Sequence, residues 1–157
     1  MAHDSRKIAA YFISSGGLLA TRPVVVHFRD GRVQKGYVRG FSMETPIFEF
    51  MPIEQLVDEA FAEWTPVRTD DLKAIFFVRN LEGNSDRKDR IDAAREGLGT
   101  KVSVTFRDDE TVVGYIPIPW NPTADGAFYL FPADPNSNNA VISVYPASVK
   151  KVEPLST

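Results

Sequence analysis

The chain contains no cysteine and only two histidines, His3 and His27, among its 157 residues. The lack of cysteine excludes disulfide bonds, a thiolate nucleophile and zinc ligation by thiolates. Neither histidine lies at a metal-ligand spacing, so the sequence predicts no metal site and no bound cofactor. His27 aligns with Thr105 when the two halves of the sequence are compared, which favours an outward strand position over a catalytic role.

Long apolar runs and a strong excess of either charge are also missing. No stretch reaches the roughly 18 apolar residues that a membrane-spanning helix needs. The apolar residues 8–13 are followed by Ser14 to Gly17, so we expect no secretion signal. A net charge of -3 and a pI near 5.4 give no general attraction to nucleic acid. These absences favour a cytoplasmic protein with no membrane partner.

The most informative feature that is present is an internal match. Residues 27–37 align with residues 105–115, and Phe, Arg, Asp, Gly and Tyr recur in the same order. The match continues downstream, where Phe48-x-Phe50-x-Pro52 corresponds to Phe128-x-Leu130-x-Pro132. Identities that fall at turn and strand positions and keep their order predict two copies of one structural unit.

Each copy has the pattern of a small β-barrel. Apolar and polar side chains alternate through residues 24–29, the period of two that is typical of a strand with one buried face. Asp30 and Gly31 then predict a tight turn. Gly36 and Gly114 lie within the second strand of each copy, where glycine typically marks a sharp bend. Such bends allow five short strands to close into a barrel.

Two segments fall outside the match. Apolar residues recur through residues 53–64 at the spacing of an amphipathic helix, which we expect to pack on a barrel more readily than to bind a partner. Residues 80–100 are rich in balanced charges, which favours a solvated linker helix. The predicted architecture is therefore mainly β and consists of two tandem five-stranded SH3/Sm-like barrels. Its predicted parts are an N-terminal short helix or arm (1–23), a first barrel (24–79) with an inserted helix at about 53–64, a helical linker (80–100) and a second barrel (101–154).

Residues 24–41, with the sequence VVVHFRDGRVQKGYVRGF, are similar to the first motif of Sm-like proteins, which build a small SH3-like barrel. The second motif of that family, with its Arg-Gly pair for RNA, has no counterpart in residues 68–78 or 143–152, so its RNA-binding residues are not carried over. A closer likeness extends over most of residues 24–153. It resembles an uncharacterised bacterial domain family that occurs alone or beside signalling modules of the PilZ kind. This resemblance implies no known chemistry.

A basic stripe around an aromatic residue is the first candidate binding site. Its members, on the first predicted hairpin, are Arg29, Arg32, Lys35, Tyr37 and Arg39. Such a stripe would suit an anionic ligand or a single-stranded nucleic acid. The alternative is ordinary cross-strand pairing with Glu49 on the neighbouring strand.

An asparagine-rich loop with a nearby tryptophan is the second candidate, as a recognition loop. Its members are Trp120, Asn121, Asp134, Asn136, Asn138 and Asn139. Amide and carboxylate side chains offer both hydrogen-bond donors and acceptors to a partner. The alternative is a plain polar hairpin loop, with Trp120 buried at the end of a barrel. A calcium loop is excluded, because no central glycine and no bidentate glutamate follow at the required spacing.

Three functions remain open. The sequence favours a non-catalytic binding or adaptor module of unknown ligand, with a regulatory or protein-interaction role. The first alternative is an Sm-like RNA or nucleotide-binding protein that uses the basic stripe, although the acidic pI disfavours it. The second is an enzyme, which is disfavoured because no nucleophile, base and orienting group occur together. We expect a protein partner, or self-association through exposed barrel edges.

Overall fold

The computed structural model describes residues 22–54, 63–83, 87–95, 97–117 and 126–155. These residues form ten β-strands: β1 (Arg22–Phe28), β2 (Val33–Arg39), β3 (Ile47–Pro52), β4 (Thr65–Arg68), β5 (Leu72–Val78), β6 (Thr100–Phe106), β7 (Thr111–Ile116), β8 (Phe128–Pro132), β9 (Asn139–Val144) and β10 (Val149–Pro154). Two short 3-10 turns, η4 (Thr69–Asp71) and η5 (Pro146–Ser148), lead directly into β5 and β10. Within the described ranges, no helix is long and apolar enough to cross a membrane.

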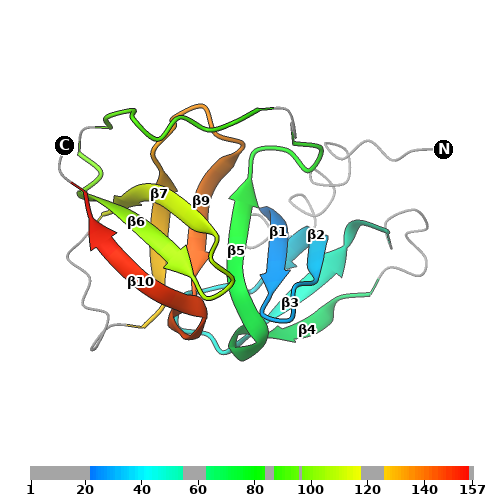
Figure 1. Ribbon diagram of the computed structural model, residues 1–157. Coiled ribbons are helices and arrows are strands. Elements are labelled where there is room, and N and C mark those ends of the chain that lie inside the picture. Colours follow the sequence, from blue (N-terminus) through cyan, green and yellow to red (C-terminus); the bar gives the residue numbers. More distant parts are fainter. Residues whose placement is uncertain (1–21, 55–62, 84–86, 96, 118–125, 156–157) are drawn as a thin grey trace.

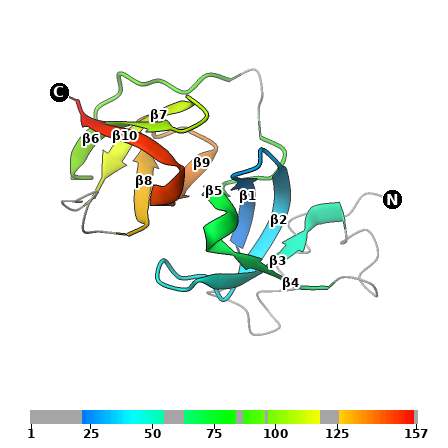
Figure 2. The same ribbon diagram turned by 60° about the horizontal axis from the view of Figure 1, so that its bottom comes forward.

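All ten strands belong to one open antiparallel sheet, in the order β10-β6-β7-β8-β9-β5-β1-β2-β3-β4 (Figure 1). We call β1–β5 the first half and β6–β10 the second half. The halves are joined by a ladder between β5 and β9, which pairs Ala74 with Val144 and Phe76 with Ile142. Figure 2 shows β6–β10 on one side of β5 and β1–β4 on the other. The expectation of two tandem five-stranded barrels is therefore wrong.

The physical reason for this correction lies in β5, every residue of which is buried. Ile75 and Phe77 belong to a core formed mainly by the first half. Ala74 and Phe76 point to the opposite face, into a core formed mainly by the second half. In a separate barrel one of these apolar faces would contact water, at a cost of about 25 cal/mol for each Å² exposed. The second half covers that face, so the two halves share one sheet.

The predicted glycine positions are explained by close backbone approaches. Gly36 in β2 lies opposite Pro52 in β3, and a Cβ atom on Gly36 would collide with the carbonyl oxygen of Met51. Gly114 in β7 is in the same situation against the carbonyl oxygen of Phe131. Only glycine, which has no Cβ, allows neighbouring strands to approach so closely here.

The expected helices are not found in the described residues. Of the predicted insertion at 53–64, residues 55–62 lie outside them, and residues 53–54 form part of a 3-10 turn. In the predicted linker, residues 87–95 contain no helix or strand. Of the predicted N-terminal arm, residues 1–21 lie outside the described part, and Arg22 already begins β1.

Candidate functional site

The two halves of the sheet meet at a small pocket, which we call the seam pocket. Its volume is about 150 Å³, and it is lined by side chains from the turn after β1, from β5, from the turn after β6 and from η5. The lining residues are Arg29, Lys73, Phe106, Arg107, Asp108, Ala147 and Ser148. Three of them are cations and one is an anion, so the pocket has a cationic wall.

Lys73 is a buried cation that connects the two halves. It lies on β5 with only 7% of its surface exposed. Its Nζ donates to Asp108 Oδ2 at 2.7 Å and lies 3.4 Å from Glu110 Oε2, on the β6–β7 turn. The hydrogen bond from Lys73 holds the pKa of Asp108 below its usual value. The charge of Lys73 is thus balanced by carboxylates from the other half.

Arg29 and Arg107 occupy matching places in the two halves. The Arg29 amide donates to Asp71 O at 2.9 Å, and its Nη1 donates to Asp70 O at 3.2 Å. The Arg107 amide donates to Ser148 O at 2.8 Å, and its Nε donates to Ala147 O at 2.9 Å. Each guanidinium is therefore held by a carbonyl oxygen of a 3-10 turn, and in the described residues neither meets a carboxylate.

Arg29 belongs to the predicted basic stripe, whereas Arg107 was not among the predicted site residues. The signal was present in the sequence, because both arginines follow the matching phenylalanines of the Phe-Arg-Asp motif.

His27 packs toward the second half instead of standing outward. Its ring lies 4.4 Å from the ring of Phe76, centroid to centroid. Burial is the main cause that lowers the pKa of His27, and the nearby charges of Glu110 and Lys73 act on it in opposite directions. A neutral imidazole at pH 7 is the consequence.

The other residues of the basic stripe have partners of their own. Tyr37 is buried in the core that β2 shares with the second half. Arg32 pairs with Asp30 at 2.8 Å, and Lys35 Nζ donates to Leu81 O at 2.8 Å. Arg39 pairs with Glu49 at 2.6 Å, which is the cross-strand pairing named above as the alternative. Ligand binding by this stripe stays a prediction.

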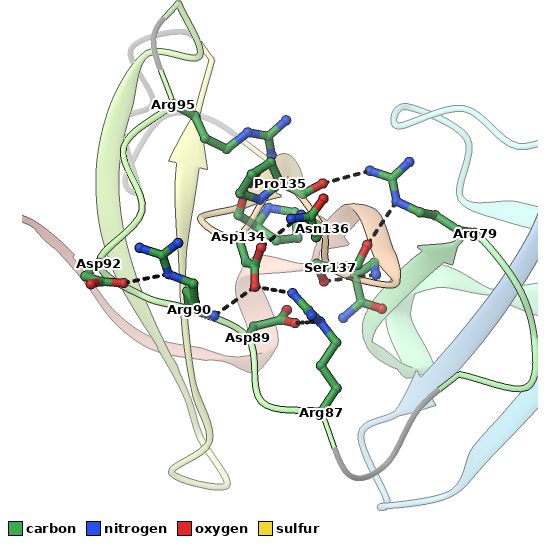
Figure 3. A network of polar contacts seen from close by, with 12 residues as sticks. Arg79, Arg87, Asp89, Arg90, Asp92, Arg95, Asp134, Pro135, Asn136 and Ser137 are labelled. Carbon is green, nitrogen blue, oxygen red and sulfur yellow. Dashed lines mark hydrogen bonds and ion pairs between the residues drawn. The ribbon is translucent and has the colours of Figure 1, made fainter.

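The asparagine-rich loop is fastened to the segment that connects the halves (Figure 3). Asp134 is 2% exposed and accepts hydrogen bonds from the Arg87 guanidinium and from the amides of Arg90 and Asn136, the last two at 3.0 and 2.9 Å. These donors, with the Arg90 amide first, lower the pKa of Asp134. Arg79 Nε donates to Ser137 O at 2.9 Å. The carboxylate thus fixes the course of residues 87–90.

Two more members of the loop also make contacts inside the chain. Asn138 accepts from the Asn80 amide at 3.2 Å and donates to Asn80 O at 3.0 Å. The amide of Asn139, the first residue of β9, donates to Ser137 Oγ at 3.0 Å. Trp120 and Asn121 lie outside the described residues. A recognition role for this loop stays a prediction.

Among the described residues, no strand pairs with β10 on the side away from β6, so β10 forms one open edge of the sheet. Antiparallel neighbours exchange hydrogen bonds at every second residue, so the residues between point their backbone groups outward. The Leu155 amide donates to Lys101 O at 2.8 Å, which makes Val152 and Pro154 outward-pointing residues. Lys150 is the extra residue of a bulge between Val149 and Lys151. The open edge therefore presents both a donor and an acceptor group at Val152.

The other open edge, β4, is less able to accept a strand. It has only four residues, and the hydrogen bond from the Thr69 amide to Pro46 O at 2.9 Å makes Pro66 and Arg68 its outward-pointing residues. Pro66 has no amide hydrogen to donate. Proline at such a position is a known protection against edge-to-edge pairing.

The part of the chain that the structure describes contains no group of three or more His, Cys, Asp or Glu side chains that could hold a metal ion.

Comparison with known proteins places the chain in a family whose function is unknown. A family model described as "Family of unknown function (DUF6982)" matches residues 20–156. No curated protein matches the chain, and no solved structure does. The expectation of an uncharacterised family is thereby confirmed, while its kinship with Sm-like or PilZ-associated proteins is not addressed by these matches.

Proposed function

The chain belongs to this family of unknown function, and from its geometry we propose that it is a non-catalytic adaptor that binds an extended segment of a partner protein along β10. The observation that carries the proposal is the edge of β10 that no described strand covers, with the outward-pointing donor and acceptor groups of Val152. Strand addition at such an edge provides affinity through backbone hydrogen bonds, and the neighbouring side chains provide selectivity.

The junction inside the molecule supports this proposal, because β5 takes the same place in the first half as β10 does in the second. There, β9 pairs with β5 along its outer side: Ile75 lies opposite Ser143, and Lys73 O accepts from the Tyr145 amide at 3.4 Å. Lys73 and Lys150 are each the extra residue of a β-bulge, in β5 and β10 respectively. The β5–β9 ladder is thus an internal example of an occupied edge.

The same comparison indicates the charge of the partner. Lys73 meets the carboxylates of Asp108 and Glu110 across the junction. Lys150 stands at the corresponding place on β10, with its exposed side chain 3.1 Å from the exposed Asp109. An exposed ion pair of this kind is worth about 1 kcal/mol or less and is easily exchanged. We therefore propose that the partner places an acidic residue near Lys150, as the β6–β7 turn does near Lys73.

The β4 edge of a second copy is a poor partner for β10. If β4 paired with β10 in the register of β9 with β5, Pro66 would lie where Ser143 lies, and Arg68 would face Lys150. Pro66 cannot donate a hydrogen bond, and two cations would repel each other. These features support a different protein as the partner, in preference to self-association through β4.

Selection from a random peptide display library tests the proposal. Peptides selected on the wild-type chain should be enriched in Asp and Glu and should slow hydrogen exchange of the Val152 amide. The substitution Val152→Pro removes only an outward-pointing donor, so it should abolish binding while the chain stays folded. Arg68→Pro makes the same change on the β4 edge and should leave binding intact. Selected peptides that bind Val152→Pro as well as wild type would refute the proposal.

We further propose a cytoplasmic location, which the absence of cysteine supports. The resemblance of residues 24–153 supports a place beside signalling modules of the PilZ kind. Cell fractionation and co-purification with such a module test these two points.

A further inference from the structure

The seam pocket is lined by two exposed arginines, Arg29 and Arg107, that come from different halves of the sheet. A guanidinium carries five N–H donors in a rigid plane. Arg29 uses its Nη1 on Asp70 O, which leaves Nε and Nη2, and Arg107 uses its Nε on Ala147 O, which leaves both Nη atoms. The two side chains are thus held in place by the backbone while most of their donors remain available.

Lys73, the third cation that lines the pocket, already has carboxylate partners. Lys73 is paired with Asp108 and Glu110. Both oxygens of Asp108 are engaged, since Oδ2 accepts from Lys73 at 2.7 Å and Oδ1 accepts from the Glu110 amide at 3.1 Å. The two arginines meet no carboxylate within the described residues, so each supplies a positive charge that has no paired anion.

We propose that the seam pocket binds a phosphate group, either as the free ion or as the monoester of a small molecule. A dianionic phosphate matches the charge of Arg29 and Arg107, and phosphate oxygens accept paired N–H donors from guanidinium groups. The pocket volume of about 150 Å³ lies below the roughly 300–1,000 Å³ of sites that enclose a whole drug-sized ligand. The pocket therefore holds the charged group and leaves the rest of the molecule outside.

This site differs from the open edge of β10 and does not depend on the proposed adaptor function. The phosphate ligand would contact the turns after β1 and β6 together with η5. Because these elements come from both halves, a bound phosphate would also add a bridge across the seam.

Nuclear magnetic resonance titration of the 15N-labelled chain tests the proposal. Inorganic phosphate and glycerol phosphate are added in separate experiments at constant ionic strength. We expect saturable shifts of the Arg29 and Arg107 signals with at least one of the two probes. Tighter binding of glycerol phosphate would identify the monoester as the ligand, and tighter binding of inorganic phosphate would identify the free ion.

Variants and pH make the test specific. Arg29→Gln and Arg107→Gln should each weaken binding at least tenfold, whereas Arg32→Gln, which changes an exposed arginine paired with Asp30, should not. The affinity for glycerol phosphate should rise between pH 5 and 7, because the second pKa of a phosphate monoester is about 6, while the affinity for sulfate should stay constant. The pH test uses only the wild-type chain, so it stands even if a variant fails to fold.

The absence of saturable shifts at millimolar phosphate, or binding that is unchanged in the Arg29→Gln/Arg107→Gln double variant, would overturn the proposal. The Val152→Pro variant should bind phosphate normally, so that a failure of the adaptor function can be told apart from a failure of the phosphate site.

Discussion

Removal of one or the other partner of the Lys73–Asp108 pair should have unequal effects on stability. Lys73 is 7% exposed, whereas more than half of the Asp108 side chain is exposed, 56%. The substitution Asp108→Asn leaves a buried cation with Glu110 alone, at 3.4 Å. The substitution Lys73→Met replaces the buried cation with an apolar chain of similar length and leaves two carboxylates that water can solvate.

The expected magnitudes follow from this asymmetry. Breaking a buried ion pair so that one charge stays buried costs about 3–5 kcal/mol. For Asp108→Asn we expect a smaller loss of stability, about 2 kcal/mol, for two reasons. Solvent screens the exposed Asp108, and Glu110 remains as a partner of the Lys73 charge. For Lys73→Met we expect a loss of about 1 kcal/mol or less, since replacement of a buried pair by apolar groups is often nearly neutral.

Urea unfolding at pH 7 measures both variants. With a slope of about 2 kcal/mol per M, Asp108→Asn should lower the midpoint by about 1 M and Lys73→Met by half of that or less. The pKa of Asp108 is depressed in the folded state, so its stabilising effect is complete above the unfolded pKa of about 3.9 and is lost as the pH falls through the folded value. The difference between wild type and Asp108→Asn should therefore shrink at pH 3. A larger loss for Lys73→Met than for Asp108→Asn would refute the reasoning.

Three further predictions concern other parts of the sheet. Gly36→Ala should destabilise the chain by about 2 kcal/mol or more in urea unfolding, because its Cβ would collide with Met51 O; Gly126→Ala, which has open space around it, should change the stability by less than about 0.5 kcal/mol. Asp134→Ala should release the connecting segment, so the Arg90 amide should exchange its hydrogen at least tenfold faster, while the exchange of the Val26 amide in β1 stays unchanged; equal protection of the Arg90 amide would contradict this. The double variant Pro66→Ser/Pro154→Val restores a donor on each open edge and should associate with rising concentration in light scattering, unlike the wild type.

Much of the strand pattern could be predicted from the sequence because it depends on local rules. The alternation in residues 24–29 and the Asp30-Gly31 turn predict the hairpin of β1 and β2, and Gly31 indeed has a φ of 96°. Gly36 was correctly marked as a special position in the second strand. Glycine is required at position 36 because the backbone of the neighbouring strand β3 leaves no room for a Cβ atom.

The arrangement of the two halves could not be predicted in the same way. The apolar run from Ala74 to Val78 indicates a strand that is buried on both faces, but it does not say which strand covers the second face. That information lies in β9, more than 60 residues further along the chain, where Ile142 and Val144 complete the core. The two-barrel expectation treated each match as a closed unit and left no partner for Ala74 and Phe76.

The polar contacts also depend on residues that are far apart in the sequence, so local patterns do not predict them. The balanced charges of residues 80–100 favoured a solvated linker helix, in which Arg90 would have contacted only residues close to it in the sequence. In the structure the Arg90 amide binds Asp134, whose carboxylate comes from the loop after β8. Arg29 was proposed from the sequence for a stripe, and its actual neighbours, Lys73 and Arg107, come together only through the β5–β9 junction.

The account depends most directly on the ladder between β5 and β9. Since Lys73 O accepts from the Tyr145 amide, Phe76 and Ile142 form a pair without mutual hydrogen bonds, in which the Cα atoms lie about 4.5 Å apart. A strong nuclear Overhauser effect between the Hα atoms of Phe76 and Ile142 is the predicted result. If this signal is missing while the Val25–Lys35 pair of β1 and β2 shows its expected cross-strand contacts, the halves are separate and the single sheet is contradicted.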